Sequence, residues 1–485
     1  MPFPANKTKI VCTIGPASNS PEILEQLILA GMNIARINFS HGDFAGHAKV
    51  INNIRSASLK AGRRVAIMAD LPGPKIRIGE FETEPVELIA GDTFTLTTEE
   101  IIGGLNRVSV NFSRLPQVVN TGDRLFLNDG LIQLRVLKVW GNKVQSEIVI
   151  GGELRSRKGL NLPGIQLGIS AFTEHDKKCL KFAAKHGIDA VSQSFVETGE
   201  DITAVRAAAT KMGYDPFIIA KIERSRALDN YDSILEAADG IMIARGDLGV
   251  EIPIEEIAVV QKRLMRQTNI VGKPVITATQ MLESMTGNRR PTRAEATDVA
   301  NAIIDGTDCV MLSGESAMGK YPVNAAGMLA GIAAATERQG LGHRLRETLK
   351  SHSRGGTASM TDLIALSVQN ALERVTPTTV IVPTRSGYTA RNIARFRLPV
   401  WITAVSSQES TCRNLLFSYG VFPVHEPDHP EDWKKFAADW LQTQGVDGSL
   451  VVLTEGPSAK HPDSNNRMEI IDLDREYDEK LDDAE

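Results

Sequence analysis

Eight short apolar runs recur along the chain, and a stretch with helical periodicity follows most of them. Continuous apolar runs of this length are typical of parallel strands that are buried on both faces. Eight such strands alternating with helices predict an α/β fold, a (β/α)8 TIM barrel. The expected strands are Lys9–Gly15, Asn33–Ser40, Val65–Leu71, Ala190–Val196, Phe217–Glu223, Gly240–Asp247, Pro274–Met281 and Cys309–Glu315.

The interval between the third and fourth runs is too long for one helical crossover, because about 120 residues separate them. It holds strand-like segments between Val86 and Ile150, separated by turn residues such as those after Ala90, Thr121 and Trp140. We therefore expect an inserted all-β domain, a β-barrel, over residues 73–163. Because it leaves after a strand, it projects from the catalytic face of the barrel and would serve as a lid.

A polar stretch over residues 346–359, rich in serine and glycine, has the composition of a linker. Strand and helix patterns alternate beyond it, which predicts a small doubly wound α/β domain over residues 360–485. The barrel itself is then expected to comprise residues 1–72 and 164–345.

The charge balance and the cysteines argue against several classes of function. A net charge of −5 gives no electrostatic case for binding nucleic acid or an anionic membrane. Cys12, Cys179, Cys309 and Cys412 lie far apart, so no CxxC motif exists and four reduced thiols are expected. The N-terminus lacks an apolar signal segment, and no apolar run reaches about 18 residues. We expect a cytoplasmic protein with no nucleic-acid or membrane partner.

Polar side chains gather at the carboxyl ends of five expected strands, where barrel enzymes place their chemistry. Residues two apart in a strand share a face, so each group should point in one direction. Charges buried there need a partner or a metal ion. The groups are Arg36, Asn38 and Ser40; Lys221 and Glu223; Arg245 and Asp247; Thr277 and Thr279; and Ser313 and Glu315.

Two of these carboxylates, Glu223 and Asp247, are predicted to bind Mg2+ or Mn2+. Magnesium usually takes one or two protein carboxylates and leaves room for substrate oxygens. Lys221 and Arg36 would supply positive charge to a phosphoryl group. The alternative is a buried ion-pair network that only closes the barrel, and matching polar groups on five strands argue against it.

Motifs distributed along the chain resemble those of the pyruvate kinase family. They cover the barrel and the inserted domain, with a weaker echo, TRSGYTAR at Thr384–Arg391, in the last domain. Their joint occurrence in order is highly specific, although any one alone would not be. The motifs are MNIARINFSHG (Met32–Gly42), DLPGPKIR (Asp70–Arg77), KGLNLPG (Lys158–Gly164), AKIE (Ala220–Glu223), ARGDLGVE (Ala244–Glu251), TATQMLESM (Thr277–Met285), RPTRAEATDVANAIIDGTD (Arg290–Asp308) and MLSGESA (Met311–Ala317).

The resemblance implies transfer of the phosphoryl group of phosphoenolpyruvate to ADP, followed by protonation of the enolate to pyruvate. By the family pattern, Glu223 and Asp247 bind the divalent ion that bridges substrate and phosphoryl group. Lys221 stabilises the phosphoryl group in transit, and Arg36 contacts the phosphate.

The resemblance also implies roles for smaller and hydroxyl-bearing residues. Thr279 would lie by the enolate carbon, in the network that delivers the proton, and Ser313 and Glu315 would belong to that network. Gly246 would donate its backbone N–H or admit the substrate closely. The alternative for Thr279 is a strand-end hydroxyl bonded to the backbone.

The nucleotide phosphates are expected near residues of both the barrel and the lid. Asn38, His41, Arg77 and Lys158 are similar to the family's residues at that site, and Asp129 lies in a lid motif, NDGLI, that faces the cleft. For His41 the alternative is a side chain that caps a turn.

Many family members require K+, in a site that resembles Asn38, Ser40, Asp70 and the carbonyl of Leu71. In those enzymes the position of Lys75 is usually Glu. A lysine ammonium is a tethered monovalent cation, so we predict that Lys75 replaces K+ and that K+ is not required. The alternative is a solvated charge at the lid hinge.

A loop in the last domain carries the side chains expected of a phosphate site. Hydroxyl and N–H groups at a helix start suit a phosphate, and the family uses a similar loop for phosphorylated effectors. An ordinary capping turn is the alternative. The resemblance also implies a homotetramer with a regulatory C-terminal domain. The loop residues are Thr384, Arg385, Ser386, Gly387 and Thr389.

Two other functions compete with this interpretation. A lyase or mutase that uses phosphoenolpyruvate would not need the lid contacts of Arg77 and Lys158. A catalytically silent regulatory protein would be expected to lack Lys221, Glu223 or Asp247, and all three are present. Pyruvate release measured with and without ADP separates the three possibilities.

Overall fold

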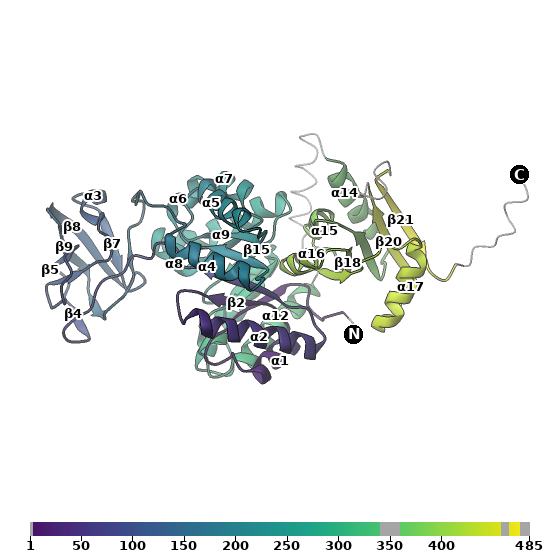
Figure 1. Ribbon diagram of the computed structural model, residues 1–485, viewed down its shortest axis with the longest axis horizontal. Coiled ribbons are helices and arrows are strands. Elements are labelled where there is room, and N and C mark those ends of the chain that lie inside the picture. The colour runs from purple at the N-terminus through teal and green to yellow at the C-terminus, as the bar shows by residue number, and fades with distance from the viewer. Residues whose placement is uncertain (1–2, 340–358, 457–464, 476–485) are drawn as a thin grey trace, which may run out of the picture.

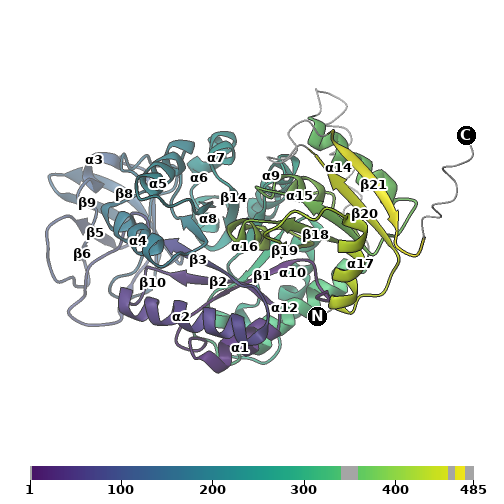
Figure 2. The same ribbon diagram turned by 45° about the vertical axis from the view of Figure 1, so that its right-hand side comes forward.

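The computed structural model describes residues 3–339, 359–456 and 465–475, and three units lie in a row (Figure 1). A small β domain occupies one end, an α/β barrel the middle and a second α/β domain the other end, as a rotated view also shows (Figure 2). Of the predicted linker 346–359, only Ser359 is among the described residues. Within these described ranges, no helix is long and apolar enough to cross a membrane.

The central unit is a closed barrel of eight parallel strands, which confirms the predicted fold class. Each of the eight apolar runs matches one barrel strand, with starts that agree to within one residue, and the order around the barrel is β1-β16-β15-β14-β13-β12-β3-β2. All five residues of β1 and all six of β3 are buried, as continuous apolar runs require. The strands are β1 (Lys9–Thr13), β2 (Met32–Asn38), β3 (Ala66–Leu71), β12 (Ala190–Gln193), β13 (Phe217–Ile222), β14 (Gly240–Ala244), β15 (Val275–Ala278) and β16 (Cys309–Leu312).

Helices surround the barrel and pack apolar faces against its strands. The first begins where Ser20 accepts a hydrogen bond from the N–H of Ile23, with Pro21 in the first turn. The elements are α1 (Pro21–Leu29), α2 (Phe44–Ala61), α4 (Glu174–Lys185), α5 (Gly199–Lys211), α6 (Ser225–Asp229), α7 (Tyr231–Ala237), α8 (Arg245–Glu251), η1 (Ile254–Glu256), α9 (Ile257–Ile270), η2 (Glu283–Thr286), α10 (Arg293–Ile304), α11 (Gly314–Ala317) and α12 (Pro322–Glu337).

Several barrel strands end earlier than the sequence predicts. Strand β14 stops at Ala244 and α8 begins at the next residue, while β15 stops at Ala278 and β16 at Leu312. The two-residue alternation therefore does not extend to the last members of the polar groups on these strands. Those side chains lie on helical turns and loops, which is a correction to the strand-face argument.

The inserted domain lies between β3 and α4 and carries its own apolar core. Its main sheet has the order β11-β7-β8-β9-β5-β6, beside a two-stranded sheet of β10 and β4. Bridges from Arg77 to Gly159 and from Ile78 to Val110 connect the two edges of the main sheet, so it closes around that core. The elements are β4 (Val86–Leu88), β5 (Thr93–Thr97), β6 (Arg107–Ser109), α3 (Leu115–Val118), β7 (Arg124–Leu127), β8 (Ile132–Trp140), β9 (Lys143–Ile150), β10 (Gly152–Leu154) and β11 (Leu160–Asn161).

The C-terminal domain is a five-stranded sheet with helices on both faces, in the order β19-β18-β17-β20-β21. Four strands are parallel, and the last strand is an antiparallel edge that the sequence did not predict. The elements are α14 (Met360–Leu372), β17 (Thr379–Pro383), α15 (Tyr388–Ala394), β18 (Trp401–Ser406), α16 (Glu409–Asn414), η3 (Leu415–Phe417), β19 (Val421–His425), α17 (Trp433–Gln444), β20 (Leu450–Glu455) and β21 (Arg467–Asp472).

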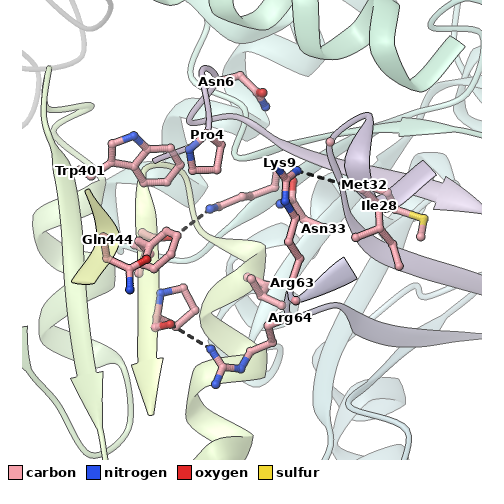
Figure 3. Close-up of a pocket in the computed structure, with 16 residues that line it drawn as sticks. Pro4, Asn6, Lys9, Ile28, Met32, Asn33, Arg63, Arg64, Trp401 and Gln444 are labelled. Carbon is pink, nitrogen blue, oxygen red and sulfur yellow. Dashed lines mark hydrogen bonds between the residues drawn. The ribbon is translucent and has the colours of Figure 1, made fainter. Parts of the chain in front are cut away.

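This domain packs against the amino ends of the barrel strands. Arg397 donates to Asp308, which directly precedes β16, at 2.8 Å, and the ring of Phe417 stacks on Phe217, the first residue of β13. A cavity of about 330 Å³ lies beside this contact, between the first strands of the barrel and β18–β19 (Figure 3). Lys9 reaches across it, donates to the carbonyl of Val421 at 2.7 Å and lies over the ring of Trp401. The cavity is thus at the barrel end opposite the polar rim.

Candidate active site

A buried chain of alternating charges crosses the carboxyl rim of the barrel. Arg36 on β2 is paired with Asp70 on β3, the residue beside Asn38 in the strand register. Lys221 on β13 lies 3.3 Å from Asp70 and 2.7 Å from Glu223. All four charged residues are at most 8% exposed, so their charges act in a weakly screened environment. The structure thus brings together four residues that the sequence singled out.

The pKa values within this chain follow from burial and from the neighbouring charges. Burial alone raises the pKa of Asp70, but Arg36 and Lys221 outweigh it and lower the pKa to about 2. Burial lowers the pKa of Lys221, and the Asp70 and Glu223 carboxylates more than compensate, so its pKa is raised. Asp70 and Lys221 are therefore fully charged at neutral pH.

Glu223 differs from Asp70 because a second acid lies near it. Burial raises the pKa of Glu223, and the charge of Asp247 raises it further, against the opposing effect of Lys221. Its Oε2 accepts a hydrogen bond from the N–H of Phe195 at 2.9 Å, which fixes the carboxylate. Two acids that repel one another in a buried site are the arrangement that a divalent cation stabilises.

Three hydroxyl residues that sequence reasoning missed complete the charge chain. Ser192 donates to Asp70 at 2.7 Å, and Ser194 accepts from Lys221 at 2.7 Å. Thr13 accepts from Arg36 at 2.9 Å and donates to the carbonyl of Leu312. Ser192 and Ser194 lie two apart at the end of an expected strand, so the parity rule could have found them.

The segments after β14 and β15 meet at a hydrogen bond between the backbone and a side chain. The N–H of Gly246 donates to the hydroxyl of Thr279 at 2.7 Å, and that hydroxyl is also 2.6 Å from the carbonyl of Ala278. Thr279 has φ +67°, a conformation that β-branched residues rarely adopt. A Cβ on residue 246 would lie 3.4 Å from that hydroxyl, which places the backbone of Gly246 directly against Thr279.

Two residues predicted to share a strand face with these neighbours bond elsewhere. Arg245 begins α8, pairs with Asp298 at 2.7 Å and donates to the backbone carbonyl of Thr279 at 2.8 Å, so it holds the backbone beneath Thr279 instead of sharing a face with Asp247. Thr277 is fully buried and donates to Thr307 at 2.9 Å within the barrel.

Glu315 is a fully buried carboxylate that ties two rim loops together. Its two oxygens accept from the backbone N–H groups of Leu282, at 3.1 Å, and of Ser313, at 2.8 Å. Ser313 directly follows β16 and is partly exposed at the rim. Glu315 and Ser313, both predicted from the sequence, thus lie at the rim, and Glu315 fixes the conformation of the two loops.

The lid residues singled out by the sequence lie on neighbouring backbone segments. Arg77 bridges to Gly159, next to Lys158, and its guanidinium donates to the carbonyl of Arg157 within the lid at 2.8 Å. Asp129 has φ +55° in an exposed turn. A small cavity between lid and barrel is lined by Lys75 and Asp129 from the lid and by Asp247 from the barrel.

The remaining predicted barrel residues lie just beyond β2. Asn38 accepts from the N–H of Ser40 at 3.0 Å, and the N–H of His41 donates to the carbonyl of Asn38 at 3.3 Å, so these residues form a turn. His41 and Ser40 are exposed at the rim, and Leu71 is fully buried at the end of β3.

The loop proposed for an effector follows β17 in the C-terminal domain. Thr384 accepts from the N–H of Gly387, at 3.0 Å, and Gly387 has φ +80° directly before α15. Arg385 and Ser386 are exposed, and their carbonyls accept from Thr411 and Arg391. Thr389 lies in the first turn of α15 and is partly exposed.

All four cysteines are buried and free, as expected. Across the described ranges, no group of three or more His, Cys, Asp and Glu side chains could hold a metal ion. The rim therefore offers a pair of carboxylates, a set that suits a cation which keeps water or substrate ligands.

Two family models match this chain: the barrel domain of pyruvate kinase over residues 5–326 and its alpha/beta domain over residues 362–471. A pyruvate kinase from Thermococcus litoralis is 50% identical, over 98% of this chain and 100% of that protein. One from Geobacillus stearothermophilus is 43% identical, over 96% of this chain and 80% of its own length. A crystal structure of a pyruvate kinase from Cryptosporidium parvum superimposes with a TM-score of 0.89 at 35% identity, covering 97% of this chain and 96% of that one.

These matches extend from the first barrel strand to the last strand of the C-terminal domain, so they cover all three units described above. With half of the residues identical to a full-length relative, the chain belongs to the pyruvate kinase family and is a phosphotransferase.

Proposed function

We propose that this enzyme transfers the phosphoryl group of phosphoenolpyruvate to ADP at the carboxyl rim of the barrel. The observation that carries the proposal is the buried charge chain from Arg36 through Asp70 and Lys221 to Glu223. Phosphoryl transfer needs positioning and charge neutralisation more than a protein nucleophile. Lys221 and Arg36 supply fixed positive charge without reorganisation, because Asp70 holds both.

A divalent cation, Mg2+ or Mn2+, would be held by Glu223 and Asp247. The donor set fits, since hard cations prefer carboxylate oxygens and magnesium keeps several non-protein ligands. The charge balance also fits: Asp70, Glu223 and Asp247 outnumber the two cations of the rim and would repel an anionic substrate. When bound, the cation neutralises developing charge on the substrate oxygens.

The neighbouring residues orient the substrate. Gly246 and Thr279 form a close backbone and hydroxyl contact beside Asp247, which suits them to hold the enolate part and to relay the proton. Glu315 fixes the loops on either side and positions Ser313. These residues act on the geometry of the site, so their loss would lower turnover.

ADP is proposed to bind between rim and lid, with Asn38 and His41 on the barrel and Arg77 and Lys158 on the lid. The cationic lid residues lie on adjacent backbone segments, so one lid movement would bring both to the phosphates. Arg77 would exchange its present bond to a lid carbonyl for a phosphate oxygen.

One coupled assay tests the proposal. Pyruvate release from phosphoenolpyruvate is measured with and without ADP, each with Mg2+, with Mn2+ and with a chelator. We expect pyruvate only when ADP and a divalent cation are both present. Consumption of phosphoenolpyruvate without ADP would favour a lyase or mutase, and no consumption under any condition would favour a silent protein.

We also propose that K+ is not required, because Lys75 supplies a tethered cation at the hinge of the lid. Its side chain passes beside Gly159 and lines the cavity that includes Asp247. Asp70, the carboxylate of the K+ site in similar enzymes, is here neutralised by Arg36 and Lys221. With Asn38, Ser40 and Leu71 unchanged, the substitution Lys75→Glu should make turnover depend on K+.

The assay compares wild type and Lys75→Glu in a buffer whose only monovalent cation is tetramethylammonium, before and after addition of KCl. We expect wild-type turnover to stay within about twofold and the variant to be activated about tenfold or more. A large activation of the wild type by K+ would contradict this role of Lys75.

A phosphorylated metabolite is proposed to bind the loop Thr384–Thr389 of the C-terminal domain and to activate the enzyme. Support comes from the exposed Arg385 and Ser386 and from Gly387, whose positive φ opens the loop before α15. The test is whether sugar phosphates or nucleotides shift the saturation curve for phosphoenolpyruvate, and whether Arg385→Ala abolishes the shift. If none of a broad panel shifts the curve, the loop is only a capping turn.

A homotetramer is proposed as the assembly. Large apolar side chains stand exposed on the barrel helices and the turns beside them, such as Ile254, Val259, Ile304 and Met318, each more than half exposed. Light scattering at several protein concentrations measures the mass directly, and a monomer at all concentrations would contradict the proposal.

A further inference from the structure

One buried arginine beside the metal carboxylates has no role in the scheme above. Arg224 directly follows Glu223 and is only 4% exposed. Its Nη2 donates to the carbonyl of Ile165 at 3.0 Å and lies 3.4 Å from the carbonyl of Leu162. These two carbonyls belong to the segment by which the chain returns from the lid to the barrel, so Arg224 binds the lid hinge directly.

The same guanidinium contacts two acids of the barrel. Its Nε lies 3.5 Å from Glu251 and its Nη2 lies 3.4 Å from Glu197. Glu251 ends α8, whose first turn carries Gly246 and Asp247. Arg224 therefore connects the lid hinge, the end of β13 and the helix that holds the second metal carboxylate.

Ser225, the next residue, makes a second set of contacts between the lid hinge and Glu251. The hydroxyl and N–H of Ser225 each lie 3.4 Å from Glu251, and the N–H of Gly164, in the lid hinge, donates to the Ser225 hydroxyl at 3.2 Å. Two consecutive residues after Glu223 thus bind the hinge on one side and Glu251 on the other.

The geometry indicates that Arg224 serves the lid rather than a structural ion pair. Its Nε and the Oε1 of Glu251 are both buried and have no hydrogen-bond partner among the described residues. A structural arginine in this position would be expected to form a two-point contact with the carboxylate. Here the Nη end of the fork points to the lid carbonyls instead, and the acid pairing is left incomplete.

We propose that Arg224 is a positioning residue that couples the lid hinge to Glu223 and to the helix carrying Asp247. When the lid moves, the carbonyls of Leu162 and Ile165 move with it, and the guanidinium transmits the change to the end of β13. The coupling rests on the proposed metal role of Glu223 and Asp247 and on the proposed binding of ADP by the lid. It predicts that Arg224 matters for the nucleotide more than for phosphoenolpyruvate, whose contacts lie on the barrel.

The test compares Arg224→Gln with Arg226→Gln as a matched control. Arg226 pairs with the same acid, Glu197, at 3.2 Å, and among the described residues it has no hydrogen bond to the hinge carbonyls that Arg224 binds. For Arg224→Gln we expect kcat to fall and KM for ADP to rise, each about tenfold, because hydrogen bonds from a charged donor are lost. KM for phosphoenolpyruvate should stay within about twofold, and Arg226→Gln should change neither constant by more than about twofold.

Hydrogen exchange of the holoenzyme gives a readout that does not depend on turnover. Arg224→Gln should speed exchange of the amides in residues 160–168, and exchange in the barrel strands should stay as in the wild type. Arg224→Lys keeps a charged donor near both carbonyls and should restore most of the protection and of the affinity for ADP. The double variant Arg224→Gln with Glu251→Gln avoids leaving a buried unpaired acid and serves if the single variant does not fold.

Three results would overturn the coupling: unchanged exchange in residues 160–168, equal effects of the Arg224 and Arg226 substitutions, or a rise in KM for phosphoenolpyruvate as large as that for ADP. A wild type without ADP-dependent activity would refute the proposed function instead, and the exchange comparison would still decide whether Arg224 holds the hinge.

Discussion

Lys221 is the residue on which most of the charge chain depends, since it contacts Asp70, Glu223 and Ser194 at once. Replacing it by Gln removes the fixed positive charge, so Glu223 loses its paired cation and Asp70 keeps only Arg36. We expect kcat to fall about a thousandfold, as when a preorganised charge-stabilising group is lost. The free energy of unfolding should fall by about 3 kcal/mol.

Steady-state kinetics and urea unfolding measure both effects. Lys262→Gln is the control, because Lys262 pairs with Asp305 on an exposed helix and its loss should change neither quantity measurably. Turnover of Lys221→Gln within tenfold of the wild type would show that another group stabilises the phosphoryl group.

Asp70 gives a prediction about pH. Its pKa in the folded state, about 2, is below the ordinary value of 3.8, so the carboxylate stabilises the fold above about pH 4. This contribution, roughly 2 kcal/mol, is lost as pH falls from about 4 toward 2. Asp70→Asn should therefore be less stable than the wild type at neutral pH, and the difference should shrink in acid.

Urea unfolding of both proteins between pH 7 and about pH 3 measures this difference. A difference that stays constant over the whole range would mean that Asp70 acts through packing and not through its charge.

At the scale of single residues, the sequence predicts which charged side chains lie together at the rim, but it does not predict which neutral side chains join them. Arg36, Lys221 and Glu223 stand out because charges at the ends of apolar strands need partners. Ser192, Ser194 and Thr13 stand out less, because a hydroxyl carries no charge that must be paired, so only the two-residue spacing of the serines could have pointed to them. Arg224 was passed over for another reason: the barrel sequence alone does not reveal that the lid hinge returns beside it.

Among the elements, the transitions after the barrel strands decide where the functional groups point. The run Gly240–Asp247 looks like one strand because no proline or N-capping residue separates its apolar part from Arg245–Asp247. The structure ends β14 at Ala244 and begins α8 at Arg245, which turns Arg245 toward Asp298. Strand periodicity cannot predict this change from strand to helix, because the change depends on how the segment after β14 packs against α9 and α10.

The first hinge of the lid depends on one glycine. Gly73 has φ +65°, and a Cβ there would lie 2.9 Å from the ring of Phe195 and 3.0 Å from the carbonyl of Ser194. Because Phe195 also binds Glu223 through its N–H, Gly73→Ala should disturb the site as well as the hinge. We expect a loss of about 1 kcal/mol in unfolding free energy and about a tenfold loss of kcat/KM for ADP.

Gly122→Ala is the matched control, since Gly122 has φ +97° in a lid turn and a Cβ there would meet nothing within 4 Å. It carries similar backbone strain without the contact with Phe195. Equal losses of activity in the two variants would mean that strain in the lid, and not the hinge contact, is responsible.

On the scale of the whole molecule, the C-terminal domain is held to the barrel by a buried ion pair. Arg397 is 2% exposed and donates to Asp308 and to Asn269 at 2.9 Å, while the N–H of Tyr419 donates to the same aspartate. Arg397→Gln should lower the free energy of unfolding by about 3 kcal/mol. We expect calorimetry to show the C-terminal domain melting separately, before the barrel.

Arg467→Gln removes an exposed pair with Glu455 on the outer edge of the same domain and should leave the transition unchanged. A single transition in Arg397→Gln at the wild-type temperature would mean that the apolar contact around Phe217 and Phe417 is sufficient to hold the domain.

The sequence predicts the three units because each has its own periodicity, but it does not predict how they join. The antiparallel strand β21 was missed because its alternation is weak and most of its residues are exposed. The interface residues Asp308 and Arg397 were missed because nothing in the motif that ends at Asp308, or in the sequence around Arg397, indicates a partner in the other domain. Contacts between domains leave little periodic signal in either partner.

Both hinges of the lid cross the rim at neighbouring strand ends, the first beside Ser194 and Phe195 and the second beside Arg224. Because the two ends of the lid domain leave the barrel side by side, the domain can be removed, lengthened or exchanged without changing how the barrel strands are connected. We call such an inserted domain a cassette and the barrel its scaffold. The nucleotide contacts of Arg77 and Lys158 and the tethered cation of Lys75 would then be inherited with the cassette, while Asn38, His41 and the chemistry on phosphoenolpyruvate stay with the scaffold. Chimaeras that join the lid of one relative to the barrel of another would show which of these properties follow the lid and which follow the barrel.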